Sequence, residues 1–464
     1  MMNTVVVGAY WGDEGKGKIV DLLAADADWI VRYNGGDNAG HTIVVGDKKV
    51  VLHTLPSGVL QGKNVAIGPD VFFNPGSFLK DLNHVKENGF KLTGKIVIDE
   101  RAHVIMPYHI KLDGASESFI GTTKRGIGPC AMDKAERTTD ITVADMTGDG
   151  FLERIRETVE AKKDEMLAKK VLTTKYDVER YCKRIHQVYS EYAERIRQYV
   201  GESSYILNEE VSKGKSVLLE GAQGSLLDVV HGTRPYVTSS NTISGGAAAN
   251  LGIDLRMFRI TGIAKAYPTR VGEGPFPTEL GSYEDAKKEE RNRKLTIEEK
   301  RKVIGGDERI LGRWIRMDGA EYGATTGRPR RTGYPDFVAL KYCAMINGID
   351  EWAITKIDVL GGKTFKAAIA YKKDRKITER FPFKLEEWKP VYSTKQYFWP
   401  SMSEDECKKA VELGYEALPE GMKKYIKDLV AYTGVPVSMI SLSPKREITV
   451  IKDVLRSTSE YLGK

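Results

Sequence analysis

The segment Gly12-Asp13-Glu14-Gly15-Lys16-Gly17-Lys18 constrains this chain most, because it follows a short apolar run and precedes a helix-forming stretch. The run Thr4-Val5-Val6-Val7 is typical of a buried strand, and residues 19–24 favour a helix. The spacing G-x-x-x-x-G-K is that of a phosphate-binding loop, in which backbone N–H groups and a helix N-terminus converge on an anion. A strand, a glycine-rich loop and a helix in this order predict an α/β fold.

Two residues distinguish this segment from an ordinary phosphate-binding loop. Ile19 stands where Ser or Thr usually supplies a hydroxyl to Mg²⁺, and isoleucine offers no ligand. Asp13 lies inside the loop and offers a carboxylate oxygen instead. Because a carboxylate facing a phosphate is repulsive unless a metal or a chemical step justifies it, we expect phosphoryl transfer with Asp13 as metal ligand, base or both. The alternative is a glycine-rich strand–helix turn that binds no nucleotide.

The composition is that of a globular protein that handles small anions. The chain has 464 residues, of which 41% are hydrophobic and 29% charged, and its net charge is +7. By length alone, two or three structural units are expected. The sequence has no dense block of Lys and Arg with interleaved aromatic residues, so we expect no nucleic-acid partner.

Cysteine spacing and the N-terminus bear on the compartment. The four cysteines lie far apart, with no C-x-x-C pair, at Cys130, Cys182, Cys343 and Cys407. This argues against a disulfide framework or a zinc site and favours a reducing compartment. The chain begins directly with a strand-like run rather than a basic leader, and no apolar run approaches the length of a membrane span. We therefore expect a cytoplasmic protein with no membrane partner.

Hydrophobic patterning changes along the chain. Residues 1–130 alternate apolar runs with glycine-rich turns, which is typical of α/β proteins. Residues 150–213 favour two or three helices with a charged, solvated face. Residues 283–302 are almost continuously charged and predict an exposed helix or a mobile insertion. Residues 371–400 predict an antiparallel hairpin or an irregular excursion. Further strands are expected at 29–33, 42–45, 96–98, 216–219, 260–264 and 353–360.

A second polar loop follows the apolar run at 29–33. It is the string Asn34-Gly35-Gly36-Asp37-Asn38-Ala39-Gly40-His41-Thr42. Its glycines let a ligand approach the backbone closely. His41 can donate to a phosphate oxygen or to a developing oxyanion. A histidine in a loop this dense in polar groups favours a functional role over a structural one.

Three further loops add hydroxyl, amide and basic groups that suit a phosphate ester. They are Gly121-Thr122-Thr123-Lys124-Arg125-Gly126-Ile127-Gly128-Pro129, Glu220-Gly221-Ala222-Gln223-Gly224 and Val237-Thr238-Ser239-Ser240-Asn241-Thr242. Each by itself is also compatible with an ordinary surface turn. Together with the phosphate-binding loop they favour a nucleotide site.

The segment from Gly323 to Thr332 carries three arginines within four residues, at Arg328, Arg330 and Arg331. These cations repel one another unless anions compensate them. Because the planar guanidinium matches carboxylate and phosphate in a bidentate manner, a dicarboxylate is a natural ligand for this loop.

The segment Thr355-Lys356-Ile357-Asp358 resembles the N-K-x-D motif with which GTPases recognise guanine, with Thr in place of Asn. A carboxylate accepts from the N1–H and the exocyclic amine of guanine. Adenine offers no matching pair of donors and would leave the aspartate buried and unpaired. The nucleotide is therefore expected to be GTP.

Together, these segments resemble the adenylosuccinate synthetases, in order along nearly the whole chain. The strings that carry the resemblance are WGDEGKGK, NGGDNAGHT, GTTKRGIGP, EGAQG, PYVTSSNT and GATTGRPRRTG. That family joins IMP to L-aspartate with hydrolysis of GTP, giving adenylosuccinate, GDP and phosphate, in the first committed step from IMP to AMP.

The resemblance implies one large α/β domain over residues 1–464, with a P-loop-NTPase-like, mostly parallel central sheet. A helical excursion is expected at about 150–213, a charged insertion at about 281–318, and guanine-binding loops in the part 353–464. The resemblance also implies a cytoplasmic homodimer in which Arg137 reaches into the site of the neighbouring subunit.

The resemblance also implies roles for individual residues. In the family, the 6-oxygen of IMP is phosphorylated and is then displaced by the amino group of aspartate. Asp13 would take the N1 proton of IMP and bind one Mg²⁺ per subunit, with the backbone of Gly40 completing the metal shell. His41 would stabilise the 6-oxyanion and the γ-phosphoryl charge as a general acid, and Lys16 would neutralise the transferred charge. Gln223 is the fourth catalytic candidate.

The binding residues are likewise carried over from the family. The IMP contacts would be Asp13, Glu14, Gly15, Lys16, Asn38, Ala39, Gly40, His41, Thr123, Arg137, Gln223, Thr238 and Arg328. The aspartate contacts would be Ala324, Thr325, Thr326, Gly327, Arg328, Pro329 and Arg330. The GTP contacts would be Gly12, Asp13, Glu14, Gly15, Lys16, Gly17, Lys18, Gly40, His41, Thr42, Arg330, Lys356, Ile357, Asp358, Ser441, Leu442 and Ser443.

The sequence departs from the family pattern at two of these loops. Lys124 stands where many members have glycine, which adds a charge near the phosphate of IMP, and Ser443 replaces the glycine of a common Ser-Thr-Gly-Pro loop. Two other functions compete with the ligase, namely a regulatory GTP-binding switch and a metabolite kinase. The switch does not explain the arginine loop or the His41 loop, which call for a second and a third ligand. Product analysis separates the kinase, which leaves a stable phosphorylated product.

Overall fold

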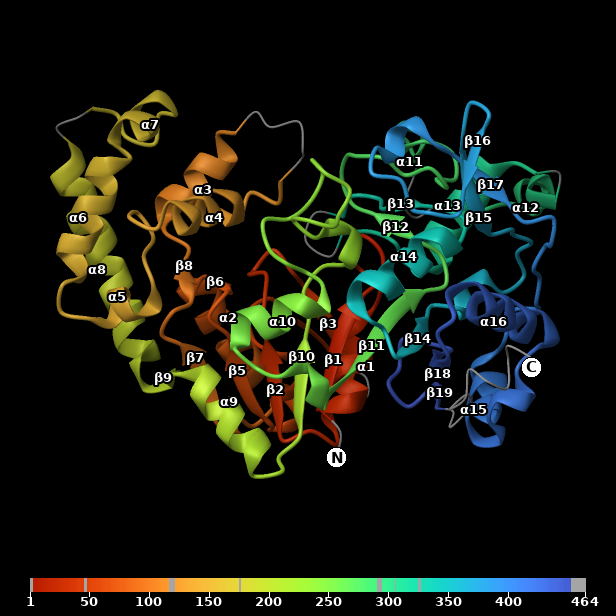
Figure 1. Ribbon diagram of the computed structural model, residues 1–464, viewed down its shortest axis with the longest axis horizontal. Helices are drawn as coiled ribbons and strands as arrows, with labels where there is room; N and C mark the ends of the chain where they lie inside the picture. The colour runs from red at the N-terminus through yellow and green to blue at the C-terminus, as the bar shows by residue number, and fades with distance from the viewer. Residues whose placement is uncertain are drawn as a thin grey trace.

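The structure, a computed structural model, describes residues 3–45, 48–116, 122–174, 177–289, 294–304, 306–323 and 327–451. Its centre is a ten-stranded sheet (Figure 1). Strands follow one another across it in the order β19 (Thr449–Ile451), β18 (Val437–Ser441), β14 (Glu351–Thr355), β11 (Phe258–Lys265), β1 (Asn3–Gly8), β10 (Val217–Glu220), β2 (Trp29–Arg32), β5 (Asn64–Ile67), β7 (Ile96–Asp99) and β9 (Val200–Gly201). All neighbours are parallel except β18 and β19. The expected mostly parallel sheet is confirmed.

The sheet is buried on both faces, which explains the continuous apolar run of β1. Val6 points to the face covered by α1 (Lys16–Ala24) and α2 (Pro75–Glu87). Val5 and Val7 point to the opposite face and its core, to which α9 (Ser203–Ser212), α10 (Ser244–Leu251), α14 (Phe337–Asn347) and α16 (Glu420–Thr433) contribute. Because side chains alternate along a strand, a strand covered on both faces needs apolar residues at every position.

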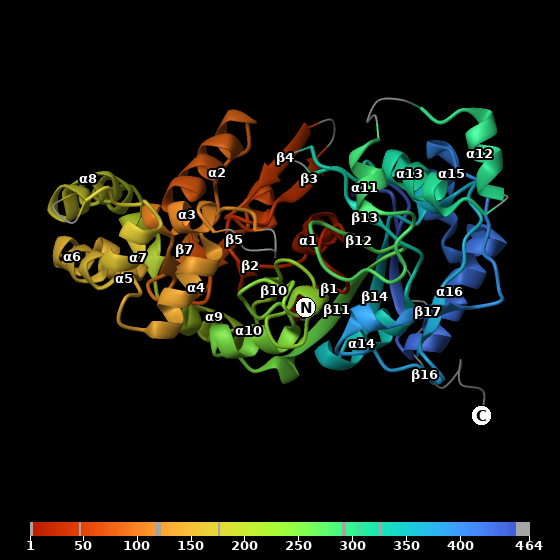
Figure 2. The ribbon, with the colours of Figure 1, turned by 90° about the horizontal axis from the view of Figure 1, so that it is seen from above.

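A helical lobe extends from one end of the sheet, on the left of Figures 1 and 2. It contains α3 (Pro107–Gly114), α4 (Ile127–Glu136), α5 (Val143–Thr147), α6 (Phe151–Ala161), α7 (Lys163–Ala168) and α8 (Val178–Ile196). The described part of residues 150–213 therefore holds four helices, α6 to α9, and the expectation of two or three is wrong. One break comes at Lys162, between α6 and α7, where the chain leaves the helical conformation for a single residue. A break this short does not interrupt the charged and apolar pattern of the sequence.

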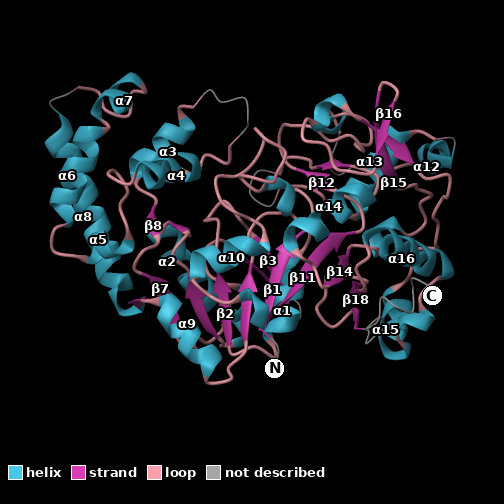
Figure 3. Cartoon of the chain, viewed as in Figure 1, coloured by secondary structure: helices cyan, strands magenta, loops and turns pink. Residues whose placement is uncertain are grey.

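The opposite end of the molecule forms a C-terminal lobe. Here β15 (Ala368–Lys373), β16 (Lys376–Thr378) and β17 (Lys389–Tyr392) make an antiparallel sheet, as expected for residues 371–400. Beside it lie α16 and α15 (Glu404–Leu413) (Figure 3). The charged insertion forms α11 (Tyr283–Lys287), α12 (Ile297–Ile304) and α13 (Glu308–Asp318). Of these, α13 lies beyond the residues 283–302 that were expected to be exposed, and it buries Ile310, Leu311 and Ile315 in the core.

Three small strand pairs lie outside the central sheet. They are β3 (His41–Val45) with β4 (Lys48–Leu52), β6 (Phe72–Phe73) with β8 (His103–Val104), and β12 (Thr269–Arg270) with β13 (Arg331–Thr332). The strand expected at 353–360 is shorter, because β14 ends at Thr355 and Lys356 has a φ of 54°. No helix within the described ranges is long and apolar enough to span a bilayer.

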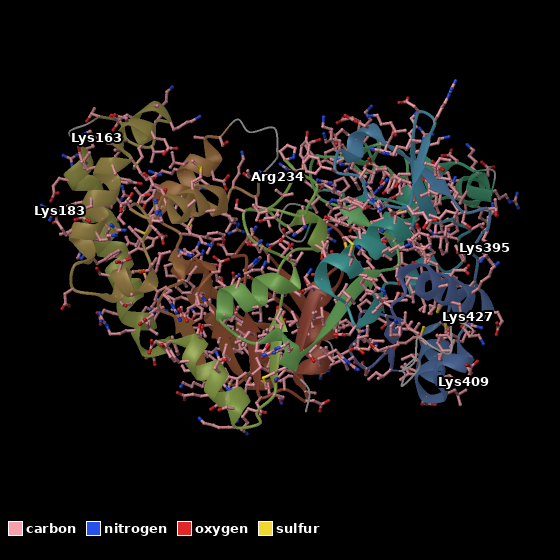
Figure 4. All side chains as sticks on the ribbon, in the orientation of Figure 1. Lys163, Lys183, Arg234, Lys395, Lys409 and Lys427 are labelled. Carbon is pink, nitrogen blue, oxygen red and sulfur yellow. The ribbon has the colours of Figure 1, made fainter. Side chains whose placement is uncertain are left out.

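Basic side chains are distributed over both lobes. Figure 4 shows Lys163 and Lys183 on the helical lobe, and Lys395, Lys409 and Lys427 on the C-terminal lobe. Positive charge is therefore not confined to one end of the molecule.

Candidate active site

The candidate site lies along the carboxyl edge of the central sheet. The phosphate-binding loop follows β1, the His41 loop follows β2, Gln223 follows β10, and Lys356 follows β14. In open α/β sheets, ligands bind outside the carboxyl ends of the strands. Because these strands run parallel in one sheet, their carboxyl ends bring four predicted loops to one edge.

The phosphate-binding loop is held open by its own acidic residue. Glu14 is fully buried, and its carboxylate accepts from Gly12 N at 2.8 Å and from Tyr10 N at 3.1 Å. The Lys16 ammonium lies 2.6 Å from the same carboxylate. Gly12, Asp13 and Gly15 all have positive φ, at 87°, 58° and 85°. Such conformations turn backbone N–H groups toward a concave surface that suits an anion.

Ile19 does not face the site. It is completely buried in the core between α1 and the sheet. Packing in the core therefore explains why an isoleucine, which cannot bind a metal, stands at this position. In this loop Asp13, an exposed residue, offers a side-chain oxygen to solvent.

His41 is oriented by a buried acid. Its Nδ1 pairs with Glu220, which also accepts from Ser57 N at 2.9 Å and from Ser57 Oγ at 3.1 Å. The Arg32 guanidinium lies 3.7 Å from Glu220, and its three nitrogens are buried without a hydrogen-bond partner. Burial lowers the pKa of His41, and Glu220 opposes this only in part. Because Nδ1 is engaged by Glu220, Nε2 is the ring nitrogen left for a ligand.

Glu220 remains ionised although it is buried. Burial raises the pKa of this carboxyl, but His41 and Arg32 outweigh burial and bring the pKa down to about 2. Glu220 and Arg32 are functional candidates that sequence reasoning missed. The one available signal was an acidic residue that ends the apolar run Val217-Leu218-Leu219.

The phosphate-binding loop meets the loop 220–224 at Gln223 and the His41 loop at Thr42. Gln223 Nε2 donates to Asn38 Oδ1 at 3.1 Å, and Gln223 Oε1 is buried without a partner. A Cβ on Gly12 would lie 3.8 Å from Gln223 Cα, and a Cβ on Gly17 would lie 3.0 Å from the Thr42 carbonyl oxygen. Any larger residue at position 17 would press against the Thr42 carbonyl, so glycine there favours the close approach of the two loops.

The arginine loop reaches the phosphate-binding loop through Arg330. Its Nε lies 2.7 Å from Asp13 Oδ2, and its Nη1 donates to Glu321 Oε2 at 3.1 Å. Arg331 instead pairs with Glu279, with Nε at 2.8 Å from Oε1. The repulsion expected among the arginines is thus compensated by protein carboxylates. Ala324, Thr325 and Thr326 lie outside the described residues.

Glu321 is the centre of a buried cluster that the sequence did not reveal. Its Oε1 lies 2.8 Å from Lys265 Nζ and 2.8 Å from Lys356 Nζ, and it accepts from Tyr267 Oη at 2.7 Å. Burial raises the pKa of Glu321, but the surrounding cations outweigh burial and hold the pKa well below its usual range. Burial lowers the pKa of Lys265 to about 8. Glu321 therefore joins the arginine loop to the end of β14.

The guanine-type segment lies beside the phosphate-binding loop. Thr355 Oγ1 donates to the Glu14 carbonyl, and Lys356 Nζ donates to the Gly319 carbonyl at 2.6 Å. Burial raises the pKa of Asp358 to about 6, although Lys356 and Lys18 oppose this shift. Asp358 is partly exposed, so its carboxylate can meet a ligand.

Other predicted residues lie farther along the edge or on the surface. Thr123 is exposed, and the neighbouring Arg125 lies 3.9 Å from Asp37 of the His41 loop. Thr238 N donates to the Leu227 carbonyl at 2.9 Å. Arg137 is exposed at the C-terminus of α4, with a φ of 73°. The remaining predicted contacts, Gly15, Ala39, Gly40, Gly327, Arg328, Pro329, Ile357 and Leu442, are on the loops described above or on the turn after β18.

An open, mostly parallel sheet that carries a phosphate-binding loop, an arginine loop and a guanine-type segment at one edge is typical of a nucleotide-dependent enzyme of the α/β class. A family model described as adenylosuccinate synthetase matches residues 5–450. The chain belongs to the adenylosuccinate synthetase family. It is a GTP-dependent ligase that joins IMP and L-aspartate to adenylosuccinate, with release of GDP and phosphate.

Relatives match along almost the full length of the chain. Adenylosuccinate synthetase of Thermodesulfovibrio yellowstonii is 40% identical over 462 residues, covering 98% of this chain and 99% of the relative. That of Clostridium botulinum strain 657 is 41% identical over 461 residues, covering 96% and 98%. The solved structure of fully ligated adenylosuccinate synthetase from Plasmodium falciparum is 31% identical and has a TM-score of 0.81, covering 98% of this chain and 100% of that one.

A more distant solved structure shares the fold alone. Succinoaminodeoxyadenylate synthetase of cyanophage S-2L is 16% identical, with a TM-score of 0.59 and coverage of 97% and 96%. The family assignment supports neither the regulatory switch nor the metabolite kinase that competed with the ligase.

Proposed function

We propose that the ligation proceeds in two steps at this edge of the sheet, through a 6-phosphoryl-IMP intermediate. In the first step the 6-oxygen of IMP attacks the γ-phosphorus of GTP, the bond to the β,γ-bridging oxygen breaks, and GDP leaves. In the second step the amino group of aspartate attacks carbon 6, phosphate leaves and the amine loses a proton. The two steps replace a poor leaving group by a good one.

The ion pair between Asp13 and Arg330 is the observation that carries this proposal. It brings a carboxylate of the phosphate-binding loop to 2.7 Å from the arginine loop. GTP and aspartate would therefore meet at Asp13. In the proposal Asp13 takes the N1 proton of IMP, and Arg330 turns from Asp13 to the incoming substrates. Gly327, Arg328 and Pro329, with residues 324–326, would complete the aspartate site.

His41 and Lys16 would act on the phosphoryl group in transfer. The buried pair with Glu220 keeps Nδ1–H of His41 engaged, so Nε2 is the nitrogen that would meet the ligand. A triphosphate beside His41 favours the charged imidazolium and would raise its pKa. His41 would then donate to the oxyanion and γ-phosphoryl oxygens. Lys16 would add a second positive charge, held in place by Glu14.

The IMP site would lie where Asn38 and Gln223 meet, with Ala39, Thr238 and Thr123 nearby on their loops. The unpartnered Oε1 of Gln223 supports this placement, since a buried amide oxygen needs a donor. The N1–H of the hypoxanthine ring is such a donor before it is lost to Asp13. The guanine of GTP would lie at Lys356, Ile357 and Asp358 and at the turn 441–443.

Asp13 and the carbonyl of Gly40 fit a site for one Mg²⁺ per subunit. Both residues are exposed, and both offer oxygen, the ligand type that Mg²⁺ prefers. Within the described ranges no three His, Cys, Asp or Glu side chains gather into a metal site. A Mg²⁺ ion that is bound mainly through substrate phosphates needs only one or two ligands from the protein. When bound, Mg²⁺ would neutralise the charge of the phosphoryl group.

We also propose that the protein acts as a cytoplasmic homodimer in which Arg137 serves the site of the partner subunit. The exposed position of Arg137 at the end of α4 supports this. The test mixes inactive Asp13→Ala subunits with inactive Arg137→Leu subunits under conditions of subunit exchange. Half of the dimers become hybrids with one intact site each, so about a quarter of the wild-type activity should return. Verified exchange without recovery would contradict the proposal.

The two-step mechanism is tested by isotope scrambling in GTP labelled with ¹⁸O at the β,γ-bridging position. With IMP and Mg²⁺ present but aspartate absent, reversible phosphoryl transfer frees the β-phosphate of GDP to rotate. The label should then appear in the β-nonbridging positions. Omission of IMP is the control and should stop the scrambling. If the complete reaction runs but no scrambling occurs with IMP alone, the intermediate does not form independently of aspartate.

A further inference from the structure

Lys18 does not face the phosphate-binding loop, although it occupies the lysine position of the G-x-x-x-x-G-K spacing. Its ammonium donates to Ser441 Oγ at 2.7 Å, to the Ser443 carbonyl at 2.7 Å and to the Ile448 carbonyl at 3.1 Å. A lysine ammonium has three N–H donors. All three are used by the turn between β18 and β19, so none is left for a phosphate.

The surroundings of Lys18 belong to the base end of the nucleotide site. Burial lowers the pKa of Lys18 to about 8, and Asp358, the expected guanine acceptor, is the strongest of the charges that oppose this shift. Ser441 is buried and its hydroxyl also donates to the Ser443 carbonyl at 3.1 Å. The ammonium is thus held by the turn and is influenced by the charge of Asp358.

A second contact from the same helix holds the same turn. Asp21, one turn after Lys18 on α1, accepts from Arg446 Nη1 at 3.3 and 3.2 Å through its two carboxylate oxygens. Gln61 Nε2 donates to Asp21 Oδ1 at 2.6 Å and fixes this carboxylate. Residues three apart on a helix lie on one face. One face of α1 therefore binds the turn at two points.

We propose that Lys18 is a positioning residue for guanine recognition, which fixes the turn 442–448 beside Asp358, and that it does not bind the phosphates. The proposal rests on GTP binding as described above. Physically, α1 carries the phosphate-binding loop at its N-terminus and the guanine turn on its side. The distance between the two ends of the nucleotide site is then set by one rigid helix. Lys16, which is held by Glu14 at the loop itself, remains the cation near the phosphates.

The experiment measures the affinities of GTP, GDP, GMP and guanosine for the wild type and for Lys18→Met. We expect Lys18→Met to weaken all four by a similar factor of about ten, because the lost contacts act on the base. The ratio of the GMP and GTP dissociation constants should not change, and discrimination against ATP should fall. A loss confined to GTP and GDP, with GMP and guanosine unaffected, would overturn the proposal.

Two further variants separate a positioning role from misfolding. Ser441→Ala removes one acceptor of Lys18 without touching the phosphate-binding loop, and we expect the same pattern with a smaller loss. Lys427→Met removes an exposed lysine of the C-terminal lobe (Figure 4) and serves as the matched charge control. If Ser441→Ala leaves every affinity unchanged, the turn does not act through Lys18 and the proposal is wrong.

Amide hydrogen exchange distinguishes the two roles of Lys18, because losing a phosphate contact would not change exchange rates in the turn. Without any nucleotide, amides of the turn 442–448 should exchange faster in Lys18→Met than in the wild type. Amides of the phosphate-binding loop should keep their rates. If wild-type protein binds no GTP at all, the proposed nucleotide site fails; if it binds GTP but the turn exchanges equally in both proteins, only the role of Lys18 fails.

Discussion

Replacing Glu321 by glutamine should cost more stability than any exposed substitution in this protein. Glu321 is fully buried and faces Lys265, Lys356 and Arg330 at 2.8, 2.8 and 3.1 Å. Glutamine keeps the shape of the side chain but carries no negative charge. Its amide NH₂ group, a donor, would also have to face one of the cations. Removing one partner of a buried ion pair costs about 3–5 kcal/mol, and we expect a loss in this range at pH 7.

The pH dependence of this loss follows from Lys265. Its pKa in the folded protein is about 8, below the ordinary 10.5. Lys265 therefore loses its proton at a lower pH in the folded state than in the unfolded state. For this group, the free energy of unfolding rises as pH increases from about 8 to 10.5. Without Glu321 the pKa of Lys265 falls further. In Glu321→Gln, Lys265 then becomes neutral at a lower pH than it does in the wild type. The difference in the free energy of unfolding between the two proteins should therefore be smaller at pH 9 than at pH 7.

Urea unfolding followed by tryptophan fluorescence and by circular dichroism would measure this effect, and agreement of the two transitions is the condition for a two-state analysis. Glu279→Gln, which loses a pairing with Arg331 alone, is the matched control and should cost less. Adding Lys265→Met to Glu321→Gln should restore part of the loss, because one unpaired cation is removed. A loss below about 1 kcal/mol, as for an exposed ion pair, would refute the buried-cluster argument.

Three further predictions concern the reaction. Asp13→Asn should lower kcat by about 10²–10⁴-fold, the range of general-base loss, while GTP still binds in a titration; turnover within a few-fold of wild type would remove Asp13 from catalysis. The KM for GTP should rise as pH falls through about 6, because Asp358 accepts from guanine only when ionised; Asp358→Asn should abolish that dependence and favour XTP, and a flat wild-type profile would place base recognition elsewhere. Arg328→Leu should raise the KM for aspartate more than that for GTP, and the reverse order would argue against the dicarboxylate site on the arginine loop.

Local order along the chain was enough to predict the fold class. The apolar run before Gly12 and the helix after it are adjacent in sequence, and so are the other strand–loop pairs. Backbone preferences and side-chain periodicity act over a few residues, so a single sequence carries them. The number of helices in 150–213 was not predicted correctly, because a break between two adjacent helical segments, here at Lys162, leaves the hydrophobic periodicity on either side intact.

The sequence by itself determined which segments carry chemistry, since residues such as Asp13, His41 and Asp358 stand in loops whose composition suits phosphate and guanine. Only the tertiary structure decided how those segments are held. Glu220 and Glu321 look like ordinary acids in the sequence, and they matter because the sheet buries them beside cations from distant strands. Lys18 is the sharpest case: its position in the motif indicates a phosphate contact, but the parallel order of β14 and β18 brings the turn after β18 to its ammonium. Burial and long-range ion pairs depend on the order of the strands in the sheet, and a local sequence pattern does not encode that order.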